Sequence, residues 1–204
     1  SFTITELNHT GIGTLPVAFF GTEEQRKRYL PGLCSGKLIG AFGLTEPEAG
    51  SDALNPKTSA TLSADGKHYI LNGSKTWISN GGLADFYCVF ARTQADAGSR
   101  GISAFIVDAG TAGLSVDDSI SVISPHPLAS LRFENCRVPR SCMLGPPDQG
   151  FKLAMRSLDI FRASVAAAAI GFARRAMQEG LQHATRRRMF GQTLADFQLT
   201  QAAF

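Results

Sequence analysis

The pattern of apolar residues changes twice along this chain, and these two changes constrain its fold more than any single motif does. Residues 1–36 and 149–204 have a helical pattern, whereas residues 37–148 contain short β-rich runs bounded by Gly, Pro, Asp or Ser. Several short strands without intervening helices favour an antiparallel barrel or sandwich. We therefore predict an α+β, multi-domain chain with an antiparallel β-barrel middle domain flanked by helical (bundle) segments.

The best-defined helix start lies at Thr22. This residue is a good N-cap, acidic residues follow in the first turn, and Gln25 occupies the capping-box position. Pro31 and Gly32 are expected to end the helix because proline removes a backbone donor and glycine disfavours helix.

The middle region carries the strand signals. The turn dipeptides Asp65-Gly66 and Asn72-Gly73 lie between β-rich segments and predict a hairpin. Further strands are expected in KLIGAFGL, DFYCVFART, GISAFIVDA and LASLRFENCRV. After LGPPDQG the helical period returns, and its predicted buried face comprises Phe151, Ala154, Leu158, Phe161, Val165, Ala168 and Phe172.

Composition narrows the class of protein. A scattered net charge of +3 argues against a nucleic-acid partner or a membrane surface. The uncharged run of residues 163–173 is too short to span a bilayer. Four cysteines without a CxxC spacing predict free, reduced thiols, with disulfides as the alternative, and hence a cytoplasmic location, or a mitochondrial matrix location in a eukaryote. Both ends fall within helical sequence, so we expect a part of a longer protein.

The stretch GLTEPEAGSD, residues 43–52, has several interpretations. Its three carboxylates lack a metal-ligand spacing, so we predict no metal there, and nothing nearby in sequence would raise a carboxyl pKa for acid–base chemistry. A solvated surface loop is the simplest alternative. The small residues of EAGSD also allow the backbone to approach a ligand and to present N–H groups to an anion. The local pattern leaves these alternatives open.

Four ordered motifs together resemble the acyl-CoA dehydrogenase family over nearly the whole chain. They are GLTEPEAGSDA, LNGSKTWISNGGLADFYCVFART, FENCRVP with LGPPDQGF, and RRRMFGQTLADFQLTQ. The resemblance implies that residues 1–36 end an N-terminal helical domain, residues 37–148 form the middle β-barrel domain, and residues 149–204 begin a C-terminal four-helix domain. It also implies bound FAD, oxidation of an acyl-CoA to its 2,3-enoyl thioester, electron transfer to an electron-transfer flavoprotein, and a homodimer or homotetramer.

The same resemblance assigns site residues. The positions that contact FAD correspond to Phe42, Leu44, Thr45, Gly50, Ser51, Trp77, Ser79, Arg187, Met189, Phe190 and Gln198. The positions on the substrate side correspond to Ser51, Thr93, Asp159 and Arg162. In the family, Thr45 would bond the flavin ring, Trp77 would cover it and the Ser79 hydroxyl would face N5. The last four FAD positions would reach the cofactor of a neighbouring subunit.

These assignments have simpler alternatives. A lone Trp in a strand, here Trp77, is usually a core residue. The run of residues 186–188 is often a solvated face, and Asp159 with Arg162 could form an intrahelical ion pair. Within the loop, Glu46, Glu48 and Asp52 are expected to shape and solvate the turn, and His126 is expected to be a loop residue.

The catalytic base is the main gap. The family places its glutamate either on the long helix, where this chain has Phe161, or in a loop that would lie beyond residue 204. We therefore name no catalytic residue. The chain also departs from the family pattern at Glu48 and over residues 121–130. Besides the dehydrogenase, a non-catalytic FAD- or acyl-CoA-binding module and a flavin oxidase or monooxygenase on the same scaffold remain open.

Overall fold

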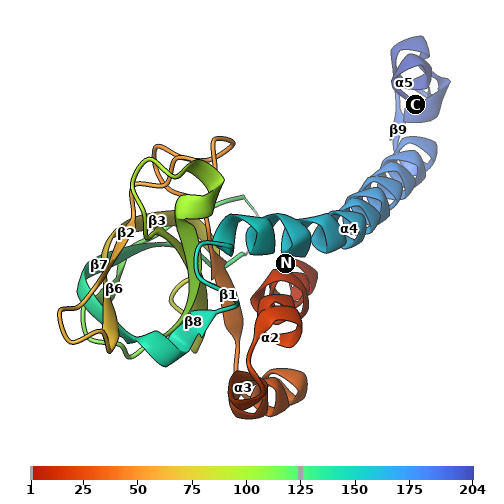
Figure 1. Ribbon diagram of the computed structural model, residues 1–204. Helices are drawn as coiled ribbons and strands as arrows, with labels where there is room; N and C mark the ends of the chain where they lie inside the picture. The colour runs from red at the N-terminus through yellow and green to blue at the C-terminus, as the bar shows by residue number, and fades with distance from the viewer. Residues whose placement is uncertain (1, 124–125) are drawn as a thin grey trace. The chain divides into compact units, whose positions relative to one another are not determined.

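The computed structural model describes residues 2–123 and 126–204 (Figure 1). It contains two compact units, which divide between Phe161 and Arg162. The first unit opens with α1 (Phe2–Asn8), the π-helical turn η1 (His9–Gly13), α2 (Leu15–Phe20) and α3 (Glu23–Ser35). Its strands are β1 (Gly40–Gly43), β2 (Ser59–Leu62), β3 (His68–Ser79), β4 (Phe86–Arg92), β5 (Ile102–Asp108), β6 (Leu114–Ser119), β7 (Leu128–Pro139) and β8 (Met143–Leu144), with 3-10 turns η2 (Gly98–Gly101) and η3 (Arg140–Cys142).

Helix α4 (Gly150–Arg186) begins in the first unit and ends in the second. The second unit continues with β9 (Arg188–Met189), β10 (Gln192–Thr193), η4 (Leu194–Asp196) and α5 (Gln198–Ala203). No helix among the described residues is long and apolar enough to cross a membrane.

The strands of the first unit form one curved sheet with the order β6-β7-β3-β2-β4-β5-β8. Most neighbouring strands are antiparallel, as predicted. The exceptions are β1 and the start of β2, which both run parallel to β4 along the edge opposite β5. In the described residues the end strands β6 and β8 do not pair with each other, so the hydrogen-bonded sheet is open. The α+β class is therefore confirmed, whereas closure into a barrel stays a prediction.

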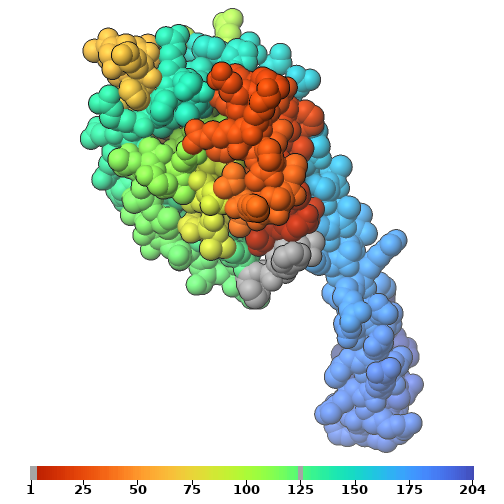
Figure 2. Space-filling model, turned by 90° about the horizontal axis from the view of Figure 1, so that it is seen from below, coloured from red at the N-terminus to blue at the C-terminus, as the bar shows by residue number. Residues whose placement is uncertain are grey.

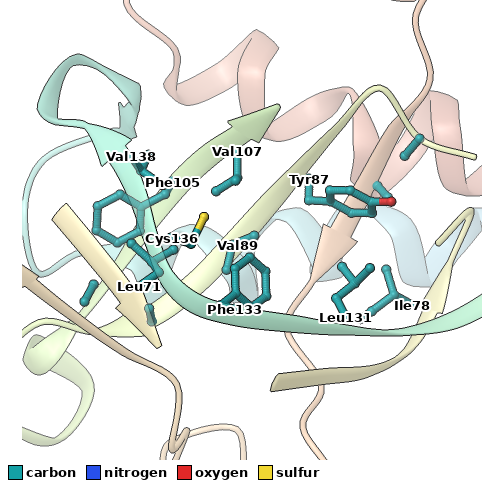
Figure 3. Close-up of a cluster of buried hydrophobic side chains, with 14 residues drawn as sticks. Leu71, Ile78, Tyr87, Val89, Phe105, Val107, Leu131, Phe133, Cys136 and Val138 are labelled. Carbon is teal, nitrogen blue, oxygen red and sulfur yellow. The ribbon is translucent and has the colours of Figure 1, made fainter. Parts of the chain in front are cut away.

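Two clusters of apolar side chains hold this unit together, and β4 contributes to both. Tyr87 and Val89 point into the concave side of the sheet, where they join side chains of β3, β5 and β7 (Figure 3). Phe86 and Phe90 point to the other side, toward the N-terminal helices and the start of α4. Successive strand residues alternate between faces, so the uncharged and wholly buried run of residues 86–91 in β4 reflects a strand covered on both faces. Figure 2 shows the N-terminal helices, red to orange, lying over the strands.

Helix α3 begins as predicted but does not end as predicted. Thr22 and Gln25 form the reciprocal capping box. The helix then continues through Pro31 to Ser35 and ends at Gly36, whose φ of 72° is left-handed. Leu33 lies beyond the proline and is buried in the helix-side cluster. The free energy gained by burying Leu33 offsets the cost of the backbone hydrogen bond that Pro31 cannot make.

The turn predicted at the first dipeptide is confirmed, and the turn predicted at the second is wrong. Asp65-Gly66 connects β2 to β3, but Asn72-Gly73 lies inside β3, where the pairing register with β7 shifts. Gly73 has a φ of 140°, and its backbone lies against Thr58. A glycine in a strand commonly marks such a bulge or a close approach of two backbones.

The predicted buried face of α4 is correct only near its start. Ala154 is buried and Leu158 is half-buried against the helix-side cluster. Val165 and Phe172, in the second unit, are 43% and 50% exposed. The predicted burial of these two side chains is therefore wrong for this chain. Strand β6 was missed by sequence reasoning because its residues are mostly polar and exposed.

Candidate functional site

The loop after β1 is attached to the last residues of β3. The Thr76 amide donates a hydrogen bond to the Thr45 carbonyl at 2.9 Å. The Lys75 ammonium donates to the Leu44 carbonyl at 3.2 Å. These bonds place Leu44 and Thr45 beside the strand segment that carries Trp77 and Ser79. The fold thus brings together four positions that the resemblance assigned to one cofactor.

A buried ion pair anchors this loop. The Glu46 carboxylate lies 2.6 Å from the Lys75 ammonium, with side-chain exposures of 3% and 0%. Glu46 also accepts the backbone N–H groups of Lys57 and Thr58. Burial alone would raise the pKa of Glu46, but the ammonium and these donors hold that pKa below its ordinary value.

The expectation that Glu46 solvates the loop is therefore wrong, whereas Glu48 and Asp52 are exposed as expected. Sequence reasoning missed the ion pair because its two members are 29 positions apart. The signal that could have indicated a buried partner for Lys75 was the position of this lysine within a predicted strand.

The end of the loop is an open turn. Glu46 and Ala49 exchange two backbone hydrogen bonds of 3.2 Å, which close a tight turn just before Gly50 and Ser51. Both of these residues are exposed, and no atom lies within 4 Å of the place where a side chain would start on Gly50. The backbone here is free to approach a ligand, as the anion-binding interpretation requires.

Trp77 is presented to solvent on a strained backbone. Its φ is 56° and its exposure is 56%, within a strand whose register with β7 shifts between Lys75 and Ile78. A bulky residue with a left-handed φ costs free energy, and such strain is concentrated at functional sites. The alternative that this lone tryptophan is a core residue is therefore wrong.

Ser79, at the end of β3, has a partner that sequence reasoning missed. Its hydroxyl lies 3.0 Å from Nε2 of His126, which precedes β7. Residues 124 and 125, within the atypical segment 121–130, lie outside the described residues. His126 was expected to be only a loop residue, and no local pattern linked it to a serine 47 positions away.

Two other predicted site residues are engaged within the first unit. The Phe42 ring is buried and packs on Phe90 with ring centroids 4.8 Å apart, so only its backbone can face a ligand. The Thr93 hydroxyl bonds Asp148 at 2.8 Å and lies 2.9 Å from the hydroxyl of Ser103. Its donor is therefore already used by a carboxylate.

The second unit carries the remaining predicted cofactor residues on or beside a short hairpin. Strands β9 and β10 are joined by Phe190 and Gly191, whose φ values of 53° and 82° are both left-handed. Phe190 is 87% exposed. Arg187 and Met189 precede this turn, whereas Gln198 begins α5. An exposed aromatic residue at a left-handed turn position is a second site of local strain.

Comparison with known proteins places this geometry in one family. Models of the acyl-CoA dehydrogenase N-terminal, middle and C-terminal domains match residues 1–37, 41–136 and 148–204, in that order. The chain belongs to the acyl-CoA dehydrogenase family. Only residues 38–40 and 137–147 fall outside the three matched ranges.

Individual relatives agree with this assignment. An acyl-CoA dehydrogenase of Bacillus subtilis (strain 168) is 43% identical over 92% of this chain and 49% of its own length. Butyryl-CoA dehydrogenase from Megasphaera elsdenii gives a TM-score of 0.90 at 41% identity, covering 98% of this chain and 52% of that one. An acyl-CoA dehydrogenase from Bacillus anthracis, solved in complex with FAD, gives 0.90 at 40% identity, covering 98% and 35%. The chain thus spans between about a third and about half of these relatives.

Two of the four predicted substrate-side residues, Asp159 and Arg162, lie on α4. Asp159 lines a cavity of about 430 Å³ together with Phe19, Phe20, Arg156 and Ile160. Phe161, at the position where some members have the base, packs on η1: a Cβ on Gly11 would lie only 2.5 Å from its ring. Arg162 is exposed at the start of the second unit. Among the described residues, no cluster of His, Cys, Asp or Glu could hold a metal ion.

Proposed function

We propose that this chain is the central part of an FAD-dependent acyl-CoA dehydrogenase that oxidises an acyl-CoA thioester to the 2,3-enoyl-CoA. The observation that carries this function is the exposed, strained Trp77 between the Thr45 loop and Ser79. An apolar ring face with a few hydroxyl and N–H donors is the environment that a flavin requires. The solved FAD complex of a relative, at 40% identity, supports the same cofactor.

The residues present fit FAD. Trp77 would cover the isoalloxazine, and Thr45 and Ser79 would supply hydrogen bonds to its polar edge. Leu44 and the Phe42 backbone would line it. The open turn at Gly50 and Ser51 would present N–H groups to the diphosphate. When bound, FAD supplies the acceptor for the hydride that leaves the β-carbon.

The second unit would complete the cofactor site of another copy of the chain. Arg187, Met189, Phe190 and Gln198 are proposed to reach the FAD of a neighbouring subunit in a homodimer or homotetramer. The exposure of Phe190 supports a role in which its ring becomes covered on assembly. Arg187 would supply a cation for the diphosphate.

The substrate side is proposed to comprise Ser51, Thr93, Asp159 and Arg162. The cavity beside Asp159 supports this placement. The α-proton requires a base, and Phe161 cannot accept a proton, so we assign the base to a part of the protein beyond residue 204. Electrons would then pass to an electron-transfer flavoprotein.

We propose the domain boundaries 1–36, 37–148 and 149–204, with the middle sheet acting as the barrel scaffold of the site. The three matched domain models support divisions near these positions. Four free cysteines, two of them buried, support a reducing compartment, either the cytoplasm or a mitochondrial matrix.

Anaerobic titration of the full-length, FAD-loaded protein with acyl-CoAs of different length and branching tests this function. We expect the visible flavin band to bleach with one class of acyl-CoA. Trp77→Ala should weaken FAD retention, whereas the same change at the exposed Leu62 should not. A protein that cannot be reconstituted with FAD would overturn the proposed function. Rapid reoxidation of the bleached protein by oxygen would instead indicate a flavin oxidase.

A further inference from the structure

On the basis of the FAD site proposed above, we propose that His126 is a positioning residue that fixes the direction of the Ser79 hydroxyl. The imidazole donates its Nε2 hydrogen to Ser79 Oγ, so that the hydroxyl hydrogen points away from His126 and toward the ligand. In this role His126 sets the hydrogen bond that the flavin edge receives, without touching the flavin itself.

The backbone holds the two side chains in register. Ser79 pairs with Leu128 at the junction of β3 and β7. The next residue, Asn80, donates its N–H to the Pro127 carbonyl at 2.9 Å. Because these pairings fix the backbone at Ser79 and at the residue next to His126, the separation of 3.0 Å between the two side chains is set largely by the sheet.

The surroundings of the imidazole favour one tautomer. Burial lowers the pKa of His126, so the ring is neutral at pH 7 and carries a single N–H. Its Nδ1 is buried and has no hydrogen-bond partner among the described residues. A buried N–H without an acceptor costs more than a buried lone pair without a donor. The hydrogen therefore belongs on Nε2, where Ser79 Oγ accepts it.

The Ser79 hydroxyl has a single hydrogen, so the tautomer of His126 determines where that hydrogen can point. With Oγ accepting from His126, the Ser79 O–H is left to donate to the ligand. N5 of an oxidised flavin is a hydrogen-bond acceptor, whereas N5 of a reduced flavin carries a hydrogen and is a donor. His126 thus favours the oxidised cofactor over the reduced one and lowers its midpoint potential.

Midpoint potentials of the full-length, FAD-loaded protein test this role through a double-mutant cycle. His126→Leu should raise the potential by about 30 mV, which corresponds to a tenfold change in a two-electron equilibrium. In a Ser79→Ala background the same change should shift the potential by much less. His126→Gln should keep the midpoint potential close to the wild-type value, because its amide N–H can replace the Nε2 donor.

His68→Leu is the matched control, since His68 lies at the opposite end of β3 and also has a buried Nδ1 with no partner in the described part of the chain. It should leave the potential unchanged. An equal shift from His126→Leu with and without Ser79 would overturn the proposed role. The stoichiometry of FAD in the wild-type protein is measured first, so a failure of the proposed cofactor site is distinguished from a failure of this inference.

Discussion

At the scale of single residues, the Glu46–Lys75 pair places two opposite charges in the interior of the protein. Removing two charges from water costs several kcal/mol for each ion, and only close pairing with further hydrogen bonds offsets this cost. Here the carboxylate meets the ammonium at 2.6 Å and accepts two backbone N–H groups as well. The pair fastens the Thr45 loop to β3, so its integrity determines whether the proposed flavin site is formed.

Replacing Lys75 by Met should lower the free energy of unfolding by about 3–5 kcal/mol at pH 7, because it leaves the Glu46 carboxylate buried without its cation. Chemical denaturation of the full-length protein measures this change. The double variant Glu46→Leu/Lys75→Met should recover part of the loss. Recovery should be incomplete because the N–H groups of Lys57 and Thr58 lose their acceptor.

The pH dependence provides the control. The pKa of folded Glu46 lies below its ordinary value of 4.5, so folding favours the charged carboxylate. The stabilisation by the pair is fully present above pH 4.5 and is lost as the pH falls through the lower folded-state pKa. The stability difference between wild type and Lys75→Met should therefore shrink in acid. A difference that stays constant down to the acid transition would contradict this account.

At the scale of elements, β3 organises the site because two irregularities redirect its backbone. Gly73 brings the strand against Thr58, and the irregularity at Trp77 turns its ring outward. A regular strand would keep strict alternation of its side chains, and Trp77 would then follow the pleat like its neighbours.

Gly73→Ala should destabilise the protein by about 2–5 kcal/mol, because its φ of 140° is unfavourable for alanine and the new Cβ would lie 2.6 Å from the Thr58 Cα. Gly66→Ala is the matched control. Its φ of 68° is also left-handed, but no atom lies within 4 Å of its Cβ position, so we expect only about 1–2 kcal/mol. Thermal unfolding measures both variants, and an equal loss of stability in the two would show that the backbone contact at Thr58 is unimportant.

The same strand shows how far sequence reasoning reaches. Asn-Gly suits either a turn or a bulge, and distant partners determine which of the two forms. The backbone N–H of Asn135 donates a hydrogen bond to the side-chain oxygen of Asn72, 63 positions away. Pro31 by itself predicts a helix end, and the helix continues because Leu33 is buried by distant elements, which the local sequence does not indicate. The local signals did identify the Thr22 cap, the Asp65-Gly66 turn and most strands. The proposed cofactor residues came from motif resemblance, since neither the strain at Trp77 nor the contact of Ser79 with His126 is encoded locally.

At the scale of the whole molecule, the second unit leaves a large apolar surface uncovered. Five large apolar side chains of α4 are between 42% and 57% exposed: Val165, Ile170, Phe172, Met177 and Leu181. At the helical repeat, Val165 and Phe172 share one face and the other three share another, and soluble proteins rarely leave so many large apolar side chains of one helix uncovered. The four-helix domain implied by the family would bury this stretch, and the chain spans only part of its relatives.

Phe172→Glu should therefore have opposite effects in two contexts. In residues 1–204 expressed alone, it should reduce self-association and dye binding, because a charge interrupts the apolar surface. In the full-length protein it should destabilise the fold by about 3–5 kcal/mol, because the same side chain would be buried there. Gln178→Glu, at an exposed polar position of the same helix, adds the same charge and should change little in either context. Sedimentation and thermal unfolding measure the two effects. If Phe172→Glu reduces self-association and leaves the thermal stability unchanged in both contexts, this part of α4 stays exposed in the full-length protein. The proposed four-helix domain would then not form around it.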